Sequence, residues 1–126
     1  MIGTRRWATL ALGIAATAAL AGCGSTATDA LPFVGQTATV TAVNIAFDPV
    51  ELALPAGGPL RIVLDNQDSG VPHNVKVFLG DREIAKSPIV TGPATTEVRF
   101  GPLPPASYQF ICDVHPNMLG TLVVSP

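Results

Sequence analysis

Along residues 37–126, apolar and polar side chains alternate with a period of two in several short stretches. In the clearest one, Leu60, Ile62 and Leu64 are separated by more polar neighbours, which is the pattern of a strand with one buried face. Segments rich in Gly and Pro interrupt the pattern, and neither a helix nor a central strand tolerates them. The sequence therefore predicts an all-β protein, a β-sandwich of about seven to eight strands. The stretches concerned are Thr37–Phe47, Val50–Leu54, Leu60–Asp65, Val75–Leu79, Val98–Phe100, Tyr108–Cys112 and Leu122–Val124.

Two regions depart from this regular alternation. Within Thr37–Phe47 the alternation changes phase near Ala42 and Val43, which indicates a β-bulge. Arg82–Thr96 carries no clear alternation and is expected to form an irregular connection.

The N-terminal segment has the layout of a secretory signal rather than of a core helix. Two basic residues, Arg5 and Arg6, precede an apolar stretch that ends in small residues beside Cys23. Leu20-Ala21-Gly22-Cys23 resembles the bacterial lipobox, in which the cysteine is lipidated and becomes the mature N-terminus. These features predict a lipoprotein signal peptide at residues 1–22, a lipidated N-terminus and flexible tether at residues 23–36, and one domain at residues 37–126.

Other interpretations of the N-terminal segment stay open. It could be an ordinary cleaved signal, or an uncleaved anchor helix, that happens to contain a cysteine. Arg5-Arg6 could also be a twin-arginine export signal, although the three residues that follow match that pattern poorly. The favoured interpretation is an extracytoplasmic domain, in the periplasm or at the cell surface, that a lipid holds to the membrane.

The balance of charged residues argues against nucleic acid as a partner. The chain has seven basic and nine acidic residues, and the predicted signal carries two of the basic ones and none of the acidic ones. Nucleic-acid binding needs a positive surface that replaces phosphate counterions, so this balance argues against it. No second apolar run is long enough to cross a bilayer.

The residues that carry chemistry are concentrated near the C-terminus. Cys112, His115 and Met118 form a C-x₂-H-x₂-M loop between two apolar strands, and His73 precedes another strand. A thiolate, two imidazoles and a thioether make a poor zinc site but suit copper, because His₂Cys with a weak Met ligand is the arrangement of electron-transfer copper. The sequence therefore predicts one copper ion, Cu(I) or Cu(II), at these four residues.

These motifs resemble those of the cupredoxins, the type 1 blue copper proteins, over residues 37–126. The resemblance implies a Greek-key β-sandwich in which His73, Cys112 and His115 are equatorial ligands and Met118 is axial. The gap between His115 and Met118 resembles that of amicyanin, whereas plastocyanin has a longer gap. The matching segments are Tyr108-x-Phe110-x-Cys112-x-x-His115-Pro116-x-Met118-x-Gly120-x-Leu122, Asn66-x-Asp68 with His73-Asn74, and Asn44-x-x-Phe47-x-Pro49 through Pro55-Ala56-Gly57.

Two residues next to the ligands are expected to tune the site. The resemblance implies that the backbone N–H of Asn74 donates a hydrogen bond to the Cys112 sulfur, a contact that tunes redox potential. Asp113 stands where related proteins more often have a small hydroxyl residue. Its carboxylate could lower the potential or simply point to water, and the sequence leaves both open.

Three functions are compatible with such a protein. The favoured one is an electron carrier rather than an enzyme, which passes single electrons between redox partners. The alternatives are an extracytoplasmic copper-binding or delivery protein and a metal-free interaction module. Hydrolysis by Cys112 and His115 is set aside, because no orienting third residue or oxyanion loop is evident. A disulfide is also set aside, because Cys23 belongs to the export motif.

The expected partner surface surrounds His115, which the resemblance makes the exit for the electron. Val71, Pro72, Pro116 and Leu119 are predicted to form a small apolar docking patch, and Leu103–Pro105 could extend it. Such redox encounters are brief and bury little area. A monomer is the default for so small a carrier.

Overall fold

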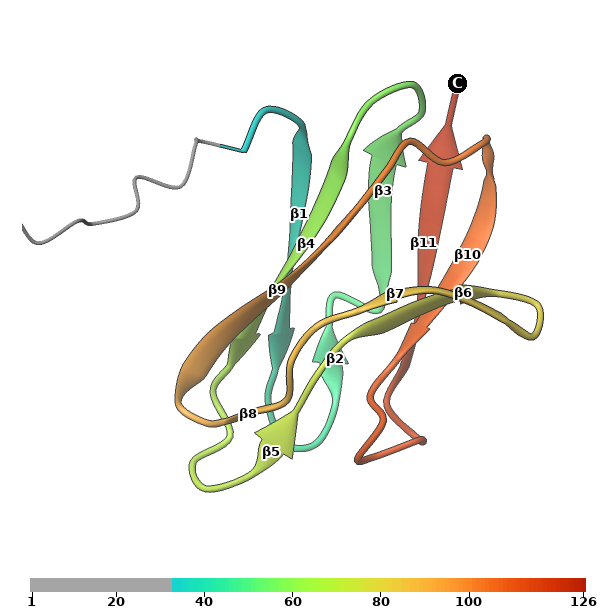
Figure 1. Ribbon diagram of the computed structural model, residues 1–126. Coiled ribbons are helices and arrows are strands. Elements are labelled where there is room, and N and C mark those ends of the chain that lie inside the picture. The colour runs from blue at the N-terminus through green and yellow to red at the C-terminus, as the bar shows by residue number, and fades with distance from the viewer. Residues whose placement is uncertain (1–32) are drawn as a thin grey trace, which may run out of the picture. The chain divides into compact units, whose positions relative to one another are not determined.

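The computed structural model describes residues 33–126, and every regular element in this range is a β-strand. Eleven strands form two main sheets and a short two-stranded ribbon (Figure 1). No element among these residues is a helix that could cross a membrane. The all-β prediction is therefore confirmed. The signal peptide, the lipidation site at Cys23 and most of the tether lie outside the described residues and stay predictions.

The first sheet has four strands in the order β2-β1-β4-β9. Its central pair, β1 and β4, is parallel, and the outer pairs are antiparallel. The bounds of its strands are β1 Gln36–Ala42, β2 Phe47–Asp48, β4 Leu60–Asn66 and β9 Ala94–Phe100.

The second sheet has five strands in the order β3-β11-β10-β6-β7. Only β3 and β11 are parallel neighbours. Its strands are β3 Glu51–Pro55, β6 Lys76–Leu79, β7 Arg82–Lys86, β10 Ala106–Ile111 and β11 Leu119–Ser125, and the separate ribbon pairs β5 Pro72–His73 with β8 Val90–Thr91.

The core lies between the two main sheets and follows the alternation of the sequence. On β4, Leu60, Ile62 and Leu64 are fully buried, while the residues between them are half-buried. On β10, Tyr108 and Phe110 point into the same core. Gly120 on β11 lies against the Phe110 ring, where an added Cβ would approach a ring carbon to 2.1 Å. The period-two pattern thus determines which face of each strand is buried in the core.

The prediction of an irregular connection at Arg82–Thr96 is wrong. This region contains all of β7 and β8 and the start of β9. Strand β7 is the edge of its sheet and none of its residues is buried. Its residues therefore need not alternate between apolar and polar. Strand β8 has two residues, which is too short for any periodicity to appear.

The predicted bulge near Ala42 and Val43 is also wrong, because the chain reverses there. Val43 and Ala46 exchange backbone hydrogen bonds of 3.0 and 3.2 Å around a two-residue turn. The central residues, Asn44 and Ile45, have φ angles of 54° and 55°, as a type I′ turn requires. The phase change in the sequence marks this hairpin between β1 and β2. The bulge that does occur lies between Val77 and Phe78, where β6 pairs with β7.

The turn is strained at Ile45, which leads to a test. A β-branched residue is a clear outlier at positive φ, whereas Asn-Gly is the preferred pair for this turn. Ile45→Gly is expected to raise the free energy of unfolding by about 1 kcal/mol, measured by urea denaturation of the full chain. Ile89→Gly is the control: Ile89 is 54% exposed but not at positive φ, so its replacement should not stabilise. An Ile45→Gly protein no more stable than the wild type would show that the turn carries no strain.

Candidate metal centre

Cys112 reaches the interior because it continues the inward face of β10. It follows Tyr108 and Phe110 at the spacing of alternate residues, and its free thiol is fully buried. The loop after it is closed by two backbone hydrogen bonds: the N–H of Cys112 donates to the carbonyl of Met118 at 3.2 Å, and the N–H of Met118 donates to the carbonyl of His115 at 2.9 Å. Met118 is also buried. The pairing of β10 with β11 therefore fixes both ends of the loop that carries three candidate ligands.

His73 approaches the same loop from the β5–β8 ribbon. Figure 1 shows this ribbon and the β10–β11 loop at the same end of the sandwich. The Nδ1 atom of His73 lies 3.7 Å from the Cys112 sulfur and 3.2 Å from the Nδ1 atom of His115. One ligand atom from each of the three residues lies within 4.8 Å of the others. The structure therefore brings together residues that are about forty positions apart in the sequence.

The spacing of these atoms fits a single shared ion. Nitrogen and sulfur ligands lie about 2.0–2.3 Å from a metal such as zinc, so donors around one ion are separated by about 3–4 Å. The separations of 3.2 and 3.7 Å fall in this range. Thiolate and thioether donors with two imidazoles favour copper over zinc. The residues present therefore fit one copper ion held by His73, Cys112, His115 and Met118.

Asp68, which sequence reasoning did not identify as a site residue, contacts the first histidine. Its Oδ2 atom lies 2.8 Å from Nε2 of His73. The backbone N–H of Ile45, together with His73 and the N–H of Asn44, holds the pKa of Asp68 below its ordinary value although burial opposes the shift. An ionised carboxylate can only accept, so Nε2 of His73 donates to Asp68, and Nδ1 is the nitrogen that faces Cys112 and His115. The signal in the sequence was its place in the Asn66-x-Asp68 segment before His73, which the resemblance matched without giving Asp68 a role.

Asn74 and Asp113 pair with each other across the site. The Asp113 N–H donates to the Asn74 side chain at 2.8 Å, and the Asn74 amide donates to the Asp113 carboxylate at 2.9 Å. Lys76 lies 2.6 Å from the other carboxylate oxygen. The hydrogen bond from Lys76, and then that from Asn74, lowers the pKa of Asp113. Asp113 therefore holds the loop in place, while the predicted bond from the Asn74 N–H to the Cys112 sulfur stays a prediction.

The predicted docking residues are only partly exposed. Val71 and Pro72 are half-buried, Pro116 is exposed beside His115, and Leu119 is 52% exposed. Leu119 pairs with Ile111 across the strands, so its side chain lies on the outer face of the five-stranded sheet. Leu103–Pro105 does not extend the patch. It lies in the β9–β10 loop, at the other end of β10 from the β10–β11 loop (Figure 1).

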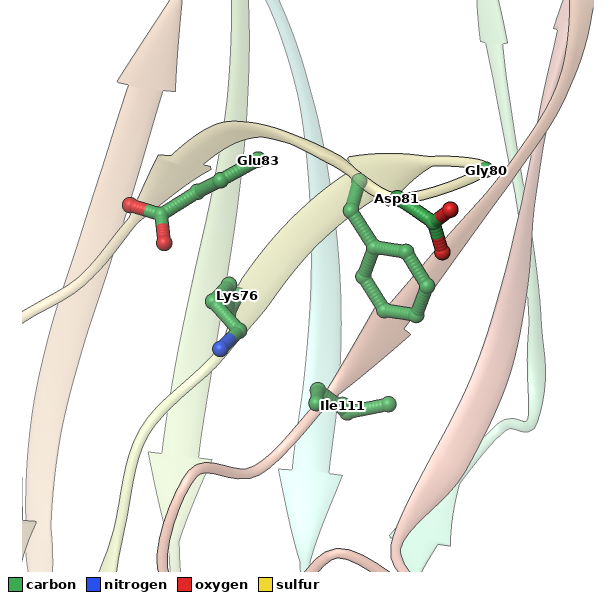
Figure 2. A pocket seen from close by; sticks show the side chains of 6 residues that line it. Lys76, Gly80, Asp81, Glu83 and Ile111 are labelled. Atoms are coloured by element: carbon green, nitrogen blue, oxygen red, sulfur yellow. The ribbon is translucent and has the colours of Figure 1, made fainter.

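A separate hollow of about 290 Å³ lies on the β6–β7 hairpin. Figure 2 shows Lys76 and Ile111 on one side of it and the turn with Gly80 and Asp81 on the other. None of the four candidate copper ligands lines this hollow, although Ile111 directly precedes Cys112. Sequence reasoning had singled out none of its residues as functional. Its complete lining is Lys76, Phe78, Gly80, Asp81, Glu83 and Ile111.

A family model described as "Cupredoxin-like domain" matches residues 12–124 of the chain. No curated protein matches the chain. Among solved structures, auracyanin A from Chloroflexus aurantiacus, described as a "blue" copper protein, is 28% identical, with a TM-score of 0.62 over 72% of this chain and all of the other. Auracyanin B is 26% identical, with a TM-score of 0.65 over 72% of this chain and 89% of the other.

An azurin from Methylomonas sp. strain J shares the fold at lower identity. It is 19% identical, with a TM-score of 0.62 over 74% of this chain and all of the other. The family match and the three structures agree with the architecture, and the description of auracyanin A also agrees with a copper site where His73, Cys112 and His115 converge.

Proposed function

The chain belongs to the cupredoxin family of copper electron-transfer proteins, and we propose that it is a membrane-anchored member that passes single electrons between redox partners through a mononuclear type 1 copper. The observation that carries the proposal is the convergence of the Cys112 sulfur and the Nδ1 atoms of His73 and His115. Copper supplies a one-electron couple when it is bound there.

The surroundings of the ligands suit electron transfer better than chemistry on a substrate. His73, Cys112 and Met118 are buried, so a substrate has little access to an ion held between them. Hydrogen bonds fix the loop at Cys112, Asp113 and Met118. A ligand set that cannot move far changes little between two oxidation states, which favours fast exchange of an electron. The same burial argues against rapid release of copper, and therefore against a delivery protein.

His115 is the proposed exit for the electron. It is half-buried, whereas the other three candidate ligands are buried, so among the four it has the best access to the surface. Pro116 and Asn117 beside it are exposed. A partner that docks over this loop would come closest to the metal through the His115 ring.

The first test is a visible and electron paramagnetic resonance spectrum of the full chain loaded with Cu(II). We expect an intense visible band and narrow copper hyperfine splitting, both lost on reduction and restored on oxidation. Cys112→Ser should abolish the band, because the thiolate supplies the charge transfer. A blue Cys112→Ser protein would rule out the type 1 assignment.

A control tests whether the loss of colour is specific to the thiolate. Ser107→Ala removes a hydroxyl from the exposed face of β10, the strand that leads into Cys112, and the spectrum should stay unchanged. A wild type that binds copper without colour or reversibility would favour the alternative, a copper-binding or delivery protein. A wild type that binds no copper would favour a metal-free module.

Membrane anchoring through Cys23 is the second element of the proposal. Its support is the lipobox-like sequence after an apolar segment. Labelled fatty acid should be incorporated into the wild type and not into Cys23→Ala, and the variant should leave the membrane fraction. Equal labelling of both proteins would contradict lipidation at this cysteine.

Docking over the His115 loop is the third element. Pro116→Glu and Leu119→Asp place a charge on exposed positions near this loop and should slow electron transfer to the physiological partner about tenfold, measured by stopped-flow absorbance. Val34→Asp is the control, because Val34 is 81% exposed and precedes β1, far along the chain from the loop. If the two loop variants transfer electrons as fast as Val34→Asp, docking occurs elsewhere.

A further inference from the structure

Asp68 connects a candidate metal ligand to the strained turn at residues 44–45. One carboxylate oxygen lies 2.8 Å from Nε2 of His73 and also accepts the N–H of Ile45 at 2.8 Å. The other accepts the N–H of Asn44 at 2.6 Å. Three donors thus converge on one side chain, which is only 11% exposed. Side chains held by several charge-assisted hydrogen bonds have little freedom to turn away.

The loop that carries Asp68 is itself fixed from within. The buried Asn66 side chain accepts the N–H of Asp68 at 3.0 Å and donates to the carbonyls of Val71 and Val90. Gly92 packs so closely that an added Cβ would lie 2.3 Å from the Asp68 carbonyl. The position of the carboxylate is therefore set by the backbone around it as well as by His73.

The two carboxylates beside the ligand residues differ in whether a cationic side chain neutralises their charge. Asp113 is paired with the Lys76 ammonium at 2.6 Å. Asp68 has no lysine or arginine partner among residues 33–126, and its only ionisable partner there is the His73 ring. The negative charge of Asp68 therefore acts on the His73 imidazole through Nε2, and the other ring nitrogen faces Cys112 and His115.

We propose that Asp68 is a positioning residue that fixes the tautomer and orientation of His73 and, through this ring, favours Cu(II) over Cu(I). The inference rests on the proposed function, because it assigns Asp68 a role toward the copper ion. A carboxylate that accepts the second N–H of a ligand histidine makes the imidazole a stronger donor and stabilises the higher charge on the metal. Loss of this carboxylate therefore raises the reduction potential.

Asp68→Asn tests the role with a side chain of the same size that can still accept a hydrogen bond. We expect the ratio of Cu(I) to Cu(II) affinity of the copper-loaded full chain to rise at least tenfold, since such partners affect metal affinity about 10- to 100-fold. For one electron, tenfold corresponds to a rise of about 59 mV in the midpoint potential, measured by redox titration of the visible band.

Asp65→Asn is the matched control for the loss of one negative charge. Asp65 lies near the end of β4, three residues before Asp68, and its carboxylate accepts a hydrogen bond from Gln67 rather than from a ligand residue. Its replacement should change the affinity ratio less than twofold. Equal shifts in the two variants would overturn the role of Asp68, because a general effect of net charge would then explain both. A wild type without a reversible copper spectrum would instead defeat the proposed function itself.

A measurement on the wild type covers the case in which Asp68→Asn does not fold. In ¹H–¹⁵N spectra of the reduced copper-loaded chain, the His73 Nε2 proton should be visible, shifted downfield and slow to exchange, because it is bonded to a buried carboxylate. A His73 ring with its proton on Nδ1, or an Nε2 proton that exchanges with water as fast as that of an exposed histidine, would overturn the proposal.

Discussion

Two hydrogen bonds between Asn74 and Asp113 join the segments that carry the ligand side chains. Asn74 directly follows His73, and Asp113 directly follows Cys112, so each bond acts one residue away from a candidate ligand. A single bond of this kind contributes about 1 kcal/mol to stability. Their larger effect is geometric, because they lie just beyond the β6–β10 pairing, in which Lys76 pairs with Ile111, and they extend this pairing to the ligand residues.

The site is buried at the end of a core that the two sheets form. Cys112 and Met118 are part of the same cluster of buried residues as Phe110 and Leu122, so both ends of the ligand loop are packed into the core. Dense packing limits the displacement of side chains. The core of the sandwich therefore holds Cys112 and Met118, whereas His73 belongs to the separate β5–β8 ribbon and contacts Asp68.

Negative charge reaches the ligands from two sides with different consequences. Asp113 is neutralised by Lys76 and acts mainly as a structural link. Asp68 is bound by backbone N–H groups of a turn whose second residue, Ile45, is in a conformation that β-branched residues avoid. Strain of this kind persists only where surrounding contacts hold it, and the carboxylate supplies two of them.

The sequence by itself determined the fold class, the copper chemistry and the four candidate ligands. Alternation in stretches such as Leu60–Asp65 is a local signal, and the C-x₂-H-x₂-M loop with His73 restricts the metal by donor type alone. The edge strand β7 was missed, because an exposed strand need not alternate. Only the tertiary structure decided that Asp68 contacts His73, that Lys76 neutralises Asp113 and that the chain reverses at Asn44 and Ile45. The ion pair of Lys76 with Asp113 and the bonds of Asp68 to Asn44 and Ile45 join residues more than twenty positions apart, and such contacts exist only once the sheets have brought distant segments together.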